Sequence, residues 1–114
     1  MRYSERQEKM FREQARLVCS RQAAWYAEQM GVEYGRIAIK NTKTRWGSCS
    51  SLGNLNFHWK LVLMPQALLD YVVVHELAHR KEMNHSARFW AIVEQELPDY
   101  QKRRNELKKL GQFL

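Results

Sequence analysis

The chain has 114 residues, 45% of them apolar and 27% charged, which predicts a single globular domain over residues 1–114 with a modest hydrophobic core. Its two cysteines, Cys19 and Cys49, are too few for a disulfide framework, so we expect a reduced, cytoplasmic protein. No apolar run approaches the roughly 20 residues of a membrane helix, and the first residues lack the apolar stretch of a signal peptide. We therefore expect neither a membrane protein nor a secreted, disulfide-rich one.

The formal net charge of +7 is concentrated at the two ends of the chain. Residues 1–21 contribute an excess of three positive charges, residues 101–114 an excess of four, and residues 22–100 are neutral overall. Arg103, Arg104, Lys108 and Lys109 cluster near the C-terminal end and raise the alternative of a nucleic-acid-binding module. We favour a solvated helix face, because this cluster lies outside the neutral centre and lacks interleaved aromatic residues.

The first predicted element is a long amphipathic helix from about Ser4 to Met30. This segment contains neither proline nor glycine, and Gly31 is a typical residue after a helix end. Its predicted buried face consists of apolar side chains at heptad spacing, namely Phe11, Val18 and Trp25. The residues beside them, Met10, Leu17 and Ala24, belong to the same face.

Short strands are expected next. Residues 36–40 alternate β-branched and polar side chains, residues 50–54 are typical of a turn, and residues 55–60 alternate again before an apolar run at 61–64. The connections favour antiparallel pairing, because a parallel crossover needs a longer segment. We therefore predict a small antiparallel sheet whose last strand extends to Met64.

Three further helices are predicted after the sheet. The first begins at Pro65 and continues to about Lys81, and its centre is apolar on every side, as in a buried central helix. The second is expected over residues 86–97, before Pro98, and the third, which is short and basic, over residues 99–110, before Gly111. Helices packed with a small antiparallel sheet make the predicted fold class α+β.

Polar residues interrupt the apolar central helix in the sequence His75-Glu76-Leu77-Ala78-His79. Histidines four residues apart project from one face of a helix and can bind one metal ion, while Glu76 lies about 100° around the helix from His75. Zinc hydrolases use this arrangement: two histidines hold Zn²⁺, and the glutamate takes a proton from water. The alternative is a structural histidine pair that Glu76 satisfies within the core without a metal.

A catalytic zinc site needs a third protein ligand, and His85 is the leading candidate. Its distance along the chain from His79 equals that in the metzincin motif, although Glu82 stands where that motif has glycine. Glu94 or Glu96 on the following helix could instead supply a carboxylate ligand. We favour His85, because imidazole suits zinc and the return of the chain is short.

Further motifs accompany this site: Thr44–Cys49 (TRWGSC), Gly53–Asn56 (GNLN), Tyr71–His79 (YVVVHELAH), Asn84–Ser86 (NHS) with Phe89–Trp90, and Leu97–Tyr100 (LPDY). Together they closely resemble the YgjP-like metallopeptidase domain family over most of the chain from Lys43 to Arg104. The resemblance implies a zincin-like fold related to that of SprT-like proteases, with His75, His79 and His85 as Zn²⁺ ligands and Glu76 as general base. Members of this family carry a β-rich stretch before the long helix, which is missing here, so we expect a short member or a fragment.

The motif and the resemblance favour a zinc-dependent metallopeptidase. Glu76 would deprotonate the attacking water, and the strand from Leu55 to Met64 would pair with an extended peptide. The resemblance also implies a different class of enzyme, a metal-dependent nucleotide pyrophosphatase acting on UTP, although the sequence has no Gly-rich phosphate loop. A DNA-associated SprT-like protease is a further alternative. The expected partners are a peptide or nucleotide substrate, without a membrane.

Four residues outside the metal motif are interpreted from their neighbours in the sequence. Arg45 could stabilise an oxyanion in the cleft, or Arg45 and Trp46 could pack at a corner of the sheet; we favour packing. His58 alternates with apolar neighbours, so we expect it on the surface or behind a metal ligand, and not as a ligand itself. Cys49 is interpreted as a small buried side chain.

Overall fold

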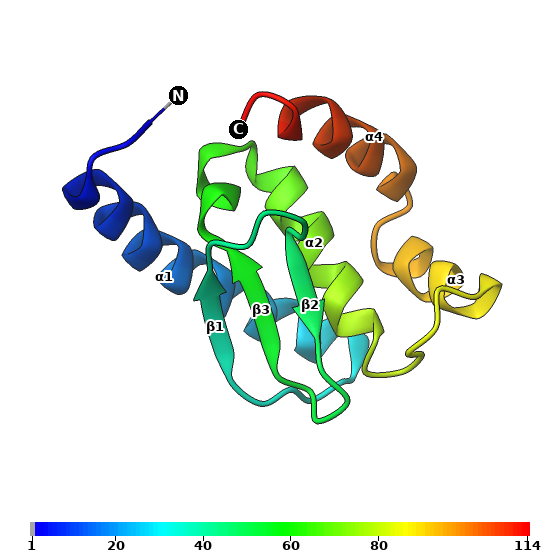
Figure 1. Ribbon diagram of the computed structural model, residues 1–114. Coiled ribbons are helices and arrows are strands. Elements are labelled where there is room, and N and C mark those ends of the chain that lie inside the picture. Colours follow the sequence, from blue (N-terminus) through cyan, green and yellow to red (C-terminus); the bar gives the residue numbers. More distant parts are fainter. Residues whose placement is uncertain (1) are drawn as a thin grey trace.

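A computed structural model describes residues 2–114 and shows helices packed around one small sheet (Figure 1). The α-helices are α1 (Glu5–Met30), α2 (Gln66–Ala78), α3 (Ala87–Glu96) and α4 (Tyr100–Gly111). The strands are β1 (Ile37–Lys40), β2 (Gly47–Cys49) and β3 (Leu55–His58), and the 3₁₀-helix η1 (Trp59–Leu63) follows β3. In Figure 1, α2 crosses the centre of the molecule behind the sheet, and α3 and α4 lie to its right. The architecture is α+β, as predicted.

α1 begins and ends where its sequence predicts. The Ser4 hydroxyl accepts a hydrogen bond from the Gln7 backbone N–H, and the Gln7 side chain accepts one from the Ser4 N–H, which completes a capping box. Gly31 ends the helix in the left-handed conformation, with φ of 69°, where glycine has no steric penalty.

The buried face of α1, however, differs from the predicted heptad face. Leu17 and Trp25 are 73% and 54% exposed, and Phe11 and Val18 are only half-buried. Small side chains spaced four residues apart replace them in the core and let α1 lie close to α2, η1 and β1. The buried residues of α1 are Ala15, Cys19, Ala23, Tyr26, Ala27 and Met30.

The sheet has the strand order β1-β3-β2 and is mixed, not wholly antiparallel as predicted. β2 and β3 form an antiparallel hairpin in which Cys49 lies opposite Leu55. β1 pairs with β3 in parallel, with Ile37 opposite Leu55. The parallel pairing is possible because β2 lies between these two strands in the sequence. β2 runs opposite to β1 and brings the chain back to the end of the sheet where β1 starts, so β3 can run in the same direction as β1.

The predicted strand at residues 61–64 is wrong, because these residues belong to η1 and its C-cap. The chain turns after His58, whose Nδ1 accepts a hydrogen bond from the Lys60 N–H. β3 is also the central strand, so both its edges are already paired, and it cannot bind an extended peptide as expected. The open edges of the sheet belong to β1 and β2.

α2 is the buried central helix that the sequence predicts. Pro65 is its N-cap, and the helix ends at Ala78, three residues before the predicted Lys81, with His79 as the C-cap. Most of its residues are buried, on all sides, between α1, the sheet and α4: Leu68, Leu69, Tyr71, Val72, Val73, Val74, Glu76, Leu77 and Ala78.

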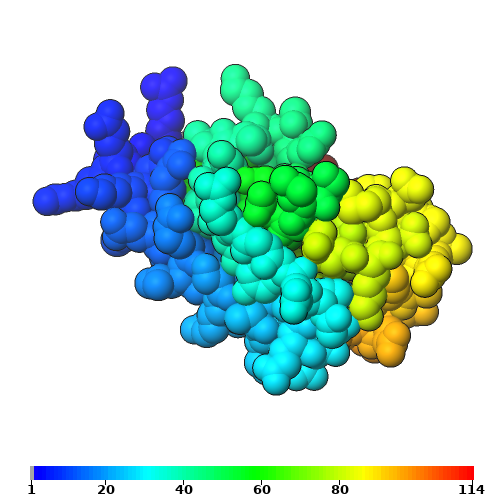
Figure 2. All heavy atoms as spheres, turned by 90° about the horizontal axis from the view of Figure 1, so that it is seen from below, coloured from blue at the N-terminus to red at the C-terminus, as the bar shows by residue number. Residues whose placement is uncertain are grey.

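α3 and α4 complete the wall beside α2. α3 begins after Ser86, whose hydroxyl accepts a hydrogen bond from the Phe89 N–H, and α4 follows a short turn through Pro98. The molecule measures 41 × 29 × 21 Å, and Figure 2 shows the first turns of α1 at one end and the α3 region at the other. Within residues 2–114, no helix combines the length and apolar character needed to cross a membrane.

Candidate metal centre

The structure brings His75, His79 and His85 together at the C-terminal end of α2. His75 lies in the last turn of the helix, His79 at its C-cap, and His85 in the loop before α3. One ring nitrogen from each histidine lies within 4.8 Å of the others, and His75 Nε2 is 3.2 Å from His85 Nε2. Among the described residues, the carboxylates of Glu94 and Glu96 are not part of this cluster. The geometry thus favours His85 as the third metal ligand.

Hydrogen bonds on the far side of two imidazoles determine which nitrogen faces the cluster. His79 Nδ1 lies 3.1 Å from the Glu82 carbonyl oxygen, which can only accept, so Nδ1 carries the proton and Nε2 keeps its lone pair. His75 Nδ1 lies 3.4 Å from the Tyr71 hydroxyl, which leaves Nε2 directed at His85. Metal-binding histidines are oriented by such outer partners, so this donor set fits Zn²⁺.

Aromatic side chains from α3 hold the three imidazoles in place. Phe89 is fully buried; its ring stacks on His79 at a centroid distance of 4.5 Å and meets His75 edge-on at 4.9 Å. The Trp90 ring is stacked with His85 at 6.0 Å. Because these rings are apolar and rigid, they fix the orientation of the ligands and keep water from one side of the site.

Burial keeps the imidazoles of His75 and His79 neutral. It lowers the pKa of His75 to about 3, with the neighbouring His79 and His85 adding to the effect. Burial also lowers the pKa of His79, although a hydrogen bond to Glu82 opposes this. Neutral imidazole is the form that binds metal, so protons compete weakly for these two ligands near neutral pH.

Glu76 lies beside the histidines and is only 6% exposed. Burial raises the pKa of its carboxyl to about 8, while the positive charge of Arg45 opposes the increase. Glu76 and the three histidines line a cavity of about 390 Å³ whose opposite wall is β2. The arrangement gives a carboxylate that can exchange protons next to a cluster of metal-binding nitrogens.

β2 comes close to α2 at Gly47. A Cβ atom there would lie 2.9 Å from Val72 Cγ1, 3.1 Å from the Asn56 carbonyl oxygen and 3.1 Å from Glu76 Cγ. Only glycine leaves enough room for the strand to pack against the helix beside Glu76. The Gly-Ser-Cys part of the TRWGSC motif therefore positions a wall of the cavity.

The two preceding residues of that motif have different roles. Arg45 is exposed and lines the metal cavity, so its predicted packing at a sheet corner is wrong. Trp46 does pack: its ring lies 5.3 Å from that of His58 and occupies the space where a side chain at Gly111 would project. Cys49 is half-buried and lines the metal cavity, a position that its interpretation as a small buried side chain did not include.

Two other expectations about position need correction. His58 is 8% exposed because the Trp46 ring covers it, so the surface alternative is wrong; among the described residues it is not part of the metal cluster. The basic residues of α4 do not all lie outside the metal-bearing centre: Arg104 and Lys108 line a cavity of about 270 Å³ together with His75 and Glu76. Arg104 also has an aromatic partner, since its guanidinium lies 4.9 Å from the centre of the Trp90 ring.

Tyr71 is a site residue that the sequence did not single out, although it stands one helical turn before His75, where a partner for that ring would lie.

Comparisons with known proteins give a family match and similar folds. The family model "YgjP-like, metallopeptidase domain" matches residues 2–110. The fold is similar to that of the metallopeptidase zymogen abylysin from Pyrococcus abyssi, with a TM-score of 0.71, 20% identity, and coverage of 82% of this chain and 95% of that one. It is also similar to the metallopeptidase zymogen jannalysin from Methanocaldococcus jannaschii, with a TM-score of 0.68, 23% identity, and coverage of 84% and 97%.

No curated protein gives a significant match. The family model, however, covers nearly the whole chain, and the three clustered histidines could hold a metal ion. The chain therefore belongs to the YgjP-like metallopeptidase domain family.

Proposed function

We propose that this metallopeptidase-family protein is a zinc-dependent peptidase, with His75, His79 and His85 as metal ligands and Glu76 as general base. The observation that carries the proposal is the convergence of three imidazole nitrogens within 4.8 Å beside a buried carboxylate. Three histidines are a ligand set that suits zinc better than magnesium, which prefers oxygen. When bound, zinc supplies Lewis acidity that polarises a carbonyl group and lowers the pKa of water.

Glu76 performs the proton transfers in this proposal. Its carboxylate takes one proton from the attacking water and passes that proton to the leaving amine nitrogen as the peptide bond breaks. A carboxyl group with a pKa of about 8, a value that already includes the opposing charge of Arg45, is mostly protonated near neutral pH; a divalent cation beside it would favour the carboxylate form. Burial makes Glu76 a stronger base than an exposed carboxylate, and the cation would keep it ionised and ready to accept a proton.

β2 is the strand that would hold an extended substrate. It is an edge strand, and its residues Gly47, Ser48 and Cys49 line the metal cavity. An extended peptide could add to this edge through main-chain hydrogen bonds and place its scissile carbonyl beside Glu76.

The decisive experiment compares Glu76→Gln with the wild type, both loaded with zinc. Glutamine keeps the shape of the side chain but cannot accept the proton, so we expect zinc content to remain and peptide hydrolysis to fall at least about a hundredfold. Glu94→Gln, an exposed position on α3, serves as the matched control and should keep both properties. Hydrolysis that survives in Glu76→Gln would exclude Glu76 as the base.

A second variant tests the ligand set. His85→Ala removes the third imidazole, so zinc stoichiometry measured by atomic absorption should fall, whereas Glu94→Gln and Glu96→Gln should retain zinc. Full zinc occupancy in His85→Ala, or its loss in either glutamine variant, would contradict the assignment.

A second candidate function, hydrolysis of UTP by a nucleotide pyrophosphatase, is favoured by one observation. Arg45, Arg104 and Lys108 line a cavity that also contains Glu76, and such cations could hold a triphosphate. Assays of UTP and of peptides on the same zinc-loaded preparation, each repeated with Glu76→Gln, distinguish the two activities.

A further inference from the structure

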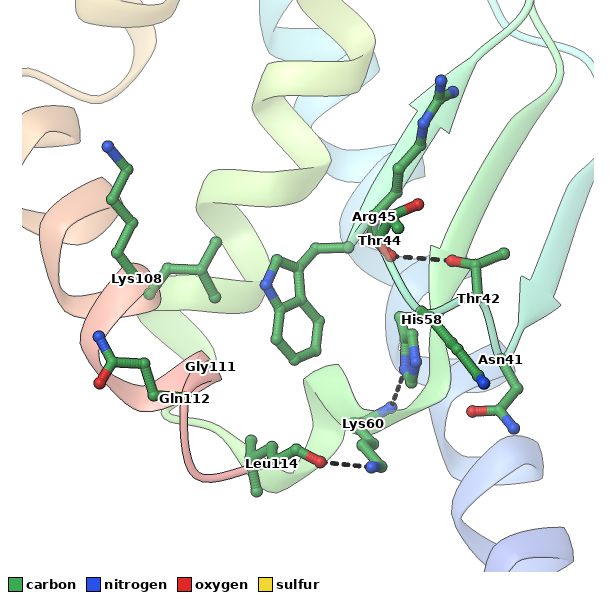
Figure 3. A pocket seen from close by; sticks show the side chains of 13 residues that line it. Asn41, Thr42, Thr44, Arg45, His58, Lys60, Lys108, Gly111, Gln112 and Leu114 are labelled. Atoms are coloured by element: carbon green, nitrogen blue, oxygen red, sulfur yellow. Dashed lines mark hydrogen bonds between the residues drawn. The ribbon is translucent and has the colours of Figure 1, made fainter.

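A groove continues from the metal cavity along the gap between β2 and α4. The cavity of about 270 Å³ beside His75 and Glu76 shares Arg45, Trp46 and Lys108 with a larger cavity of about 590 Å³ near the end of α4. Figure 3 shows the larger cavity, with Arg45 on its strand side and Lys108 on its helix side. The shared walls make the two cavities parts of one groove that opens onto the metal site.

The side chains along this groove are strongly basic, and we call it the basic groove. Its cations are Arg45, Arg104 and Lys108 near the metal site, then Lys43 and Lys60 further along. Within residues 2–114, Glu76 is the one acidic side chain that lines either cavity. Lys60 Nζ donates a hydrogen bond to the Leu114 main-chain oxygen (Figure 3), whereas the other four cations form no salt bridge in the described part of the chain. A surface that gathers four such positive charges attracts anions.

Two of these cations lie close enough to the reaction centre for their charges to act on it. Arg45 lines the metal cavity together with Glu76, and Arg104 lines the adjoining cavity together with His75 and Glu76. Arg104 is held by its cation–π contact with Trp90, which fixes the guanidinium without neutralising it. Arg103, the residue before Arg104, instead donates hydrogen bonds to Asp99 and to the Ala67 carbonyl oxygen.

The form of the groove favours carboxylates spaced along a chain over a compact triphosphate. The cations are distributed over both cavities, from Arg104 beside the metal site to Lys43 further along, and are not gathered around one point as a compact phosphate group requires. The walls between the cations are apolar, with Trp46, Val72 and Leu107. This combination suits extended peptide whose side chains alternate in direction and carry separate negative charges.

We propose that the basic groove binds acidic side chains of the substrate on one side of the scissile bond, so that the enzyme selects peptides rich in aspartate and glutamate. This inference rests on the peptidase function proposed above, and it adds the substrate class. Arg104 and Lys108 are specificity-determining residues in this view, because both line the part of the groove next to the metal site.

The test measures binding separately from cleavage. Zinc-loaded Glu76→Gln is titrated against fluorescein-labelled peptides of one sequence in which the residues flanking the central bond are glutamate, glutamine or lysine. We expect the glutamate peptide to bind at least about tenfold more tightly than the glutamine peptide, and the difference to shrink as salt is added. Mass spectrometry of a peptide library cut by the wild type should show acidic residues enriched on one side of the cleaved bond.

Charge-reversal variants on α4 provide matched controls. Arg104→Glu and Lys108→Glu should each remove most of the preference for the glutamate peptide, and together they should reverse it toward lysine. Lys102→Glu and Lys109→Glu make the same change in net charge on the same helix, at exposed positions outside the lining of the two cavities, and should preserve the preference. Circular dichroism and thermal melting confirm that each variant folds, and Lys108→Gln gives a milder second test.

The outcomes separate this inference from the proposed function. Equal affinity for the glutamate and glutamine peptides, or equal losses in Lys108→Glu and Lys109→Glu, would overturn the basic groove as a specificity site. Cleavage without preference for acidic residues would leave the peptidase function standing and remove the inference. Charge-dependent binding of the glutamate peptide without any Glu76-dependent cleavage would support the basic groove as an acidic-peptide site and contradict the proposed peptidase function. UTP binding that depends on Lys108, with no binding of the glutamate peptide, would assign the groove to phosphate instead.

Discussion

The two imidazoles on α2 are oriented by partners of different kinds. His79 donates to a backbone carbonyl oxygen at 3.1 Å, a partner that no substitution of Glu82 removes. His75 depends on a side-chain hydroxyl at the longer distance of 3.4 Å. The orientation of His75 is therefore the one that a point mutation can disturb, and the effect should be on metal affinity more than on the fold.

Tyr71→Phe tests this directly. Loss of the hydroxyl leaves His75 Nδ1 without its partner, so we expect zinc affinity to fall about tenfold, while the free energy of unfolding of the metal-free protein falls by about 1 kcal/mol or less. Competition with a chelator measures the first quantity and urea unfolding the second. Tyr34→Phe, at a half-buried tyrosine away from the cluster, is the control, and unchanged zinc affinity in Tyr71→Phe would contradict the role.

At the scale of elements, the site depends on how closely β2 approaches α2. Gly47 makes that approach possible, since a side chain there would collide with Val72, with the Asn56 carbonyl and with Glu76. A substitution at this position should therefore displace Glu76, the proposed general base, as well as strain the core.

We expect Gly47→Ala to lower the free energy of unfolding by about 1–3 kcal/mol and to lower peptide hydrolysis more than this loss of stability explains. The double variant Gly47→Ala/Val72→Ala removes the 2.9 Å contact but keeps the one with Glu76. In the Val72→Ala background, Gly47→Ala should therefore lower the free energy of unfolding less than it does in the wild type. Peptide hydrolysis by the double variant should stay as low as that of Gly47→Ala. Equal recovery of stability and hydrolysis would show that Glu76 is not displaced.

The sequence predicts those elements whose ends carry local signals. Ser4, Gly31, Pro65 and Ser86 act on the backbone beside them, and the helices begin or end within a residue of these positions. The buried face of α1 was not predictable in this way, because small residues such as Ala15 are selected by the closeness of other elements. The parallel partner of β1 likewise depends on a contact across the whole β2–β3 hairpin.

The site shows the same division. His75, Glu76 and His79 follow from helical spacing, and His85 from a short return of the chain. Tyr71 and Cys49 show no spacing signal of comparable strength, and the closeness of Arg104 and Lys108 to Glu76 arises only when α4 packs beside α2. Local chemistry was therefore predictable, whereas the surroundings that select a substrate were not.

For the whole molecule, burial of groups that ionise at high pH sets an alkaline limit to stability. Burial raises the pKa of Cys19, Tyr26 and Tyr71 to about 12, from ordinary values of 9.0 for cysteine and 10.0 for tyrosine. For Cys19 and Tyr26 the charge of Asp70 adds to this effect. Each group therefore stays protonated in the folded protein over a range in which it ionises in the unfolded chain.

The sign of the pH dependence follows from this difference. The stabilisation is fully present below about pH 9, and it is lost as pH rises through the interval up to about 12, because the unfolded chain releases protons first. Urea unfolding of the metal-free protein between about pH 7 and pH 11 should show a falling free energy of unfolding above pH 9. Cys19→Ala should make the decline less steep. A constant value over this range would contradict the burial of these groups.

The position of β2 at the edge of the sheet has a consequence for self-association. An unpaired strand edge can join a second copy of the same chain, and proteins limit this hazard by keeping such strands short and placing charges next to them. β2 has three residues and follows the exposed Arg45, which meets both conditions. A strand this short can offer only a few main-chain hydrogen bonds to any partner. The shortness of β2 thus both limits aggregation and makes binding at this edge depend on side-chain contacts, which differ from one peptide to another.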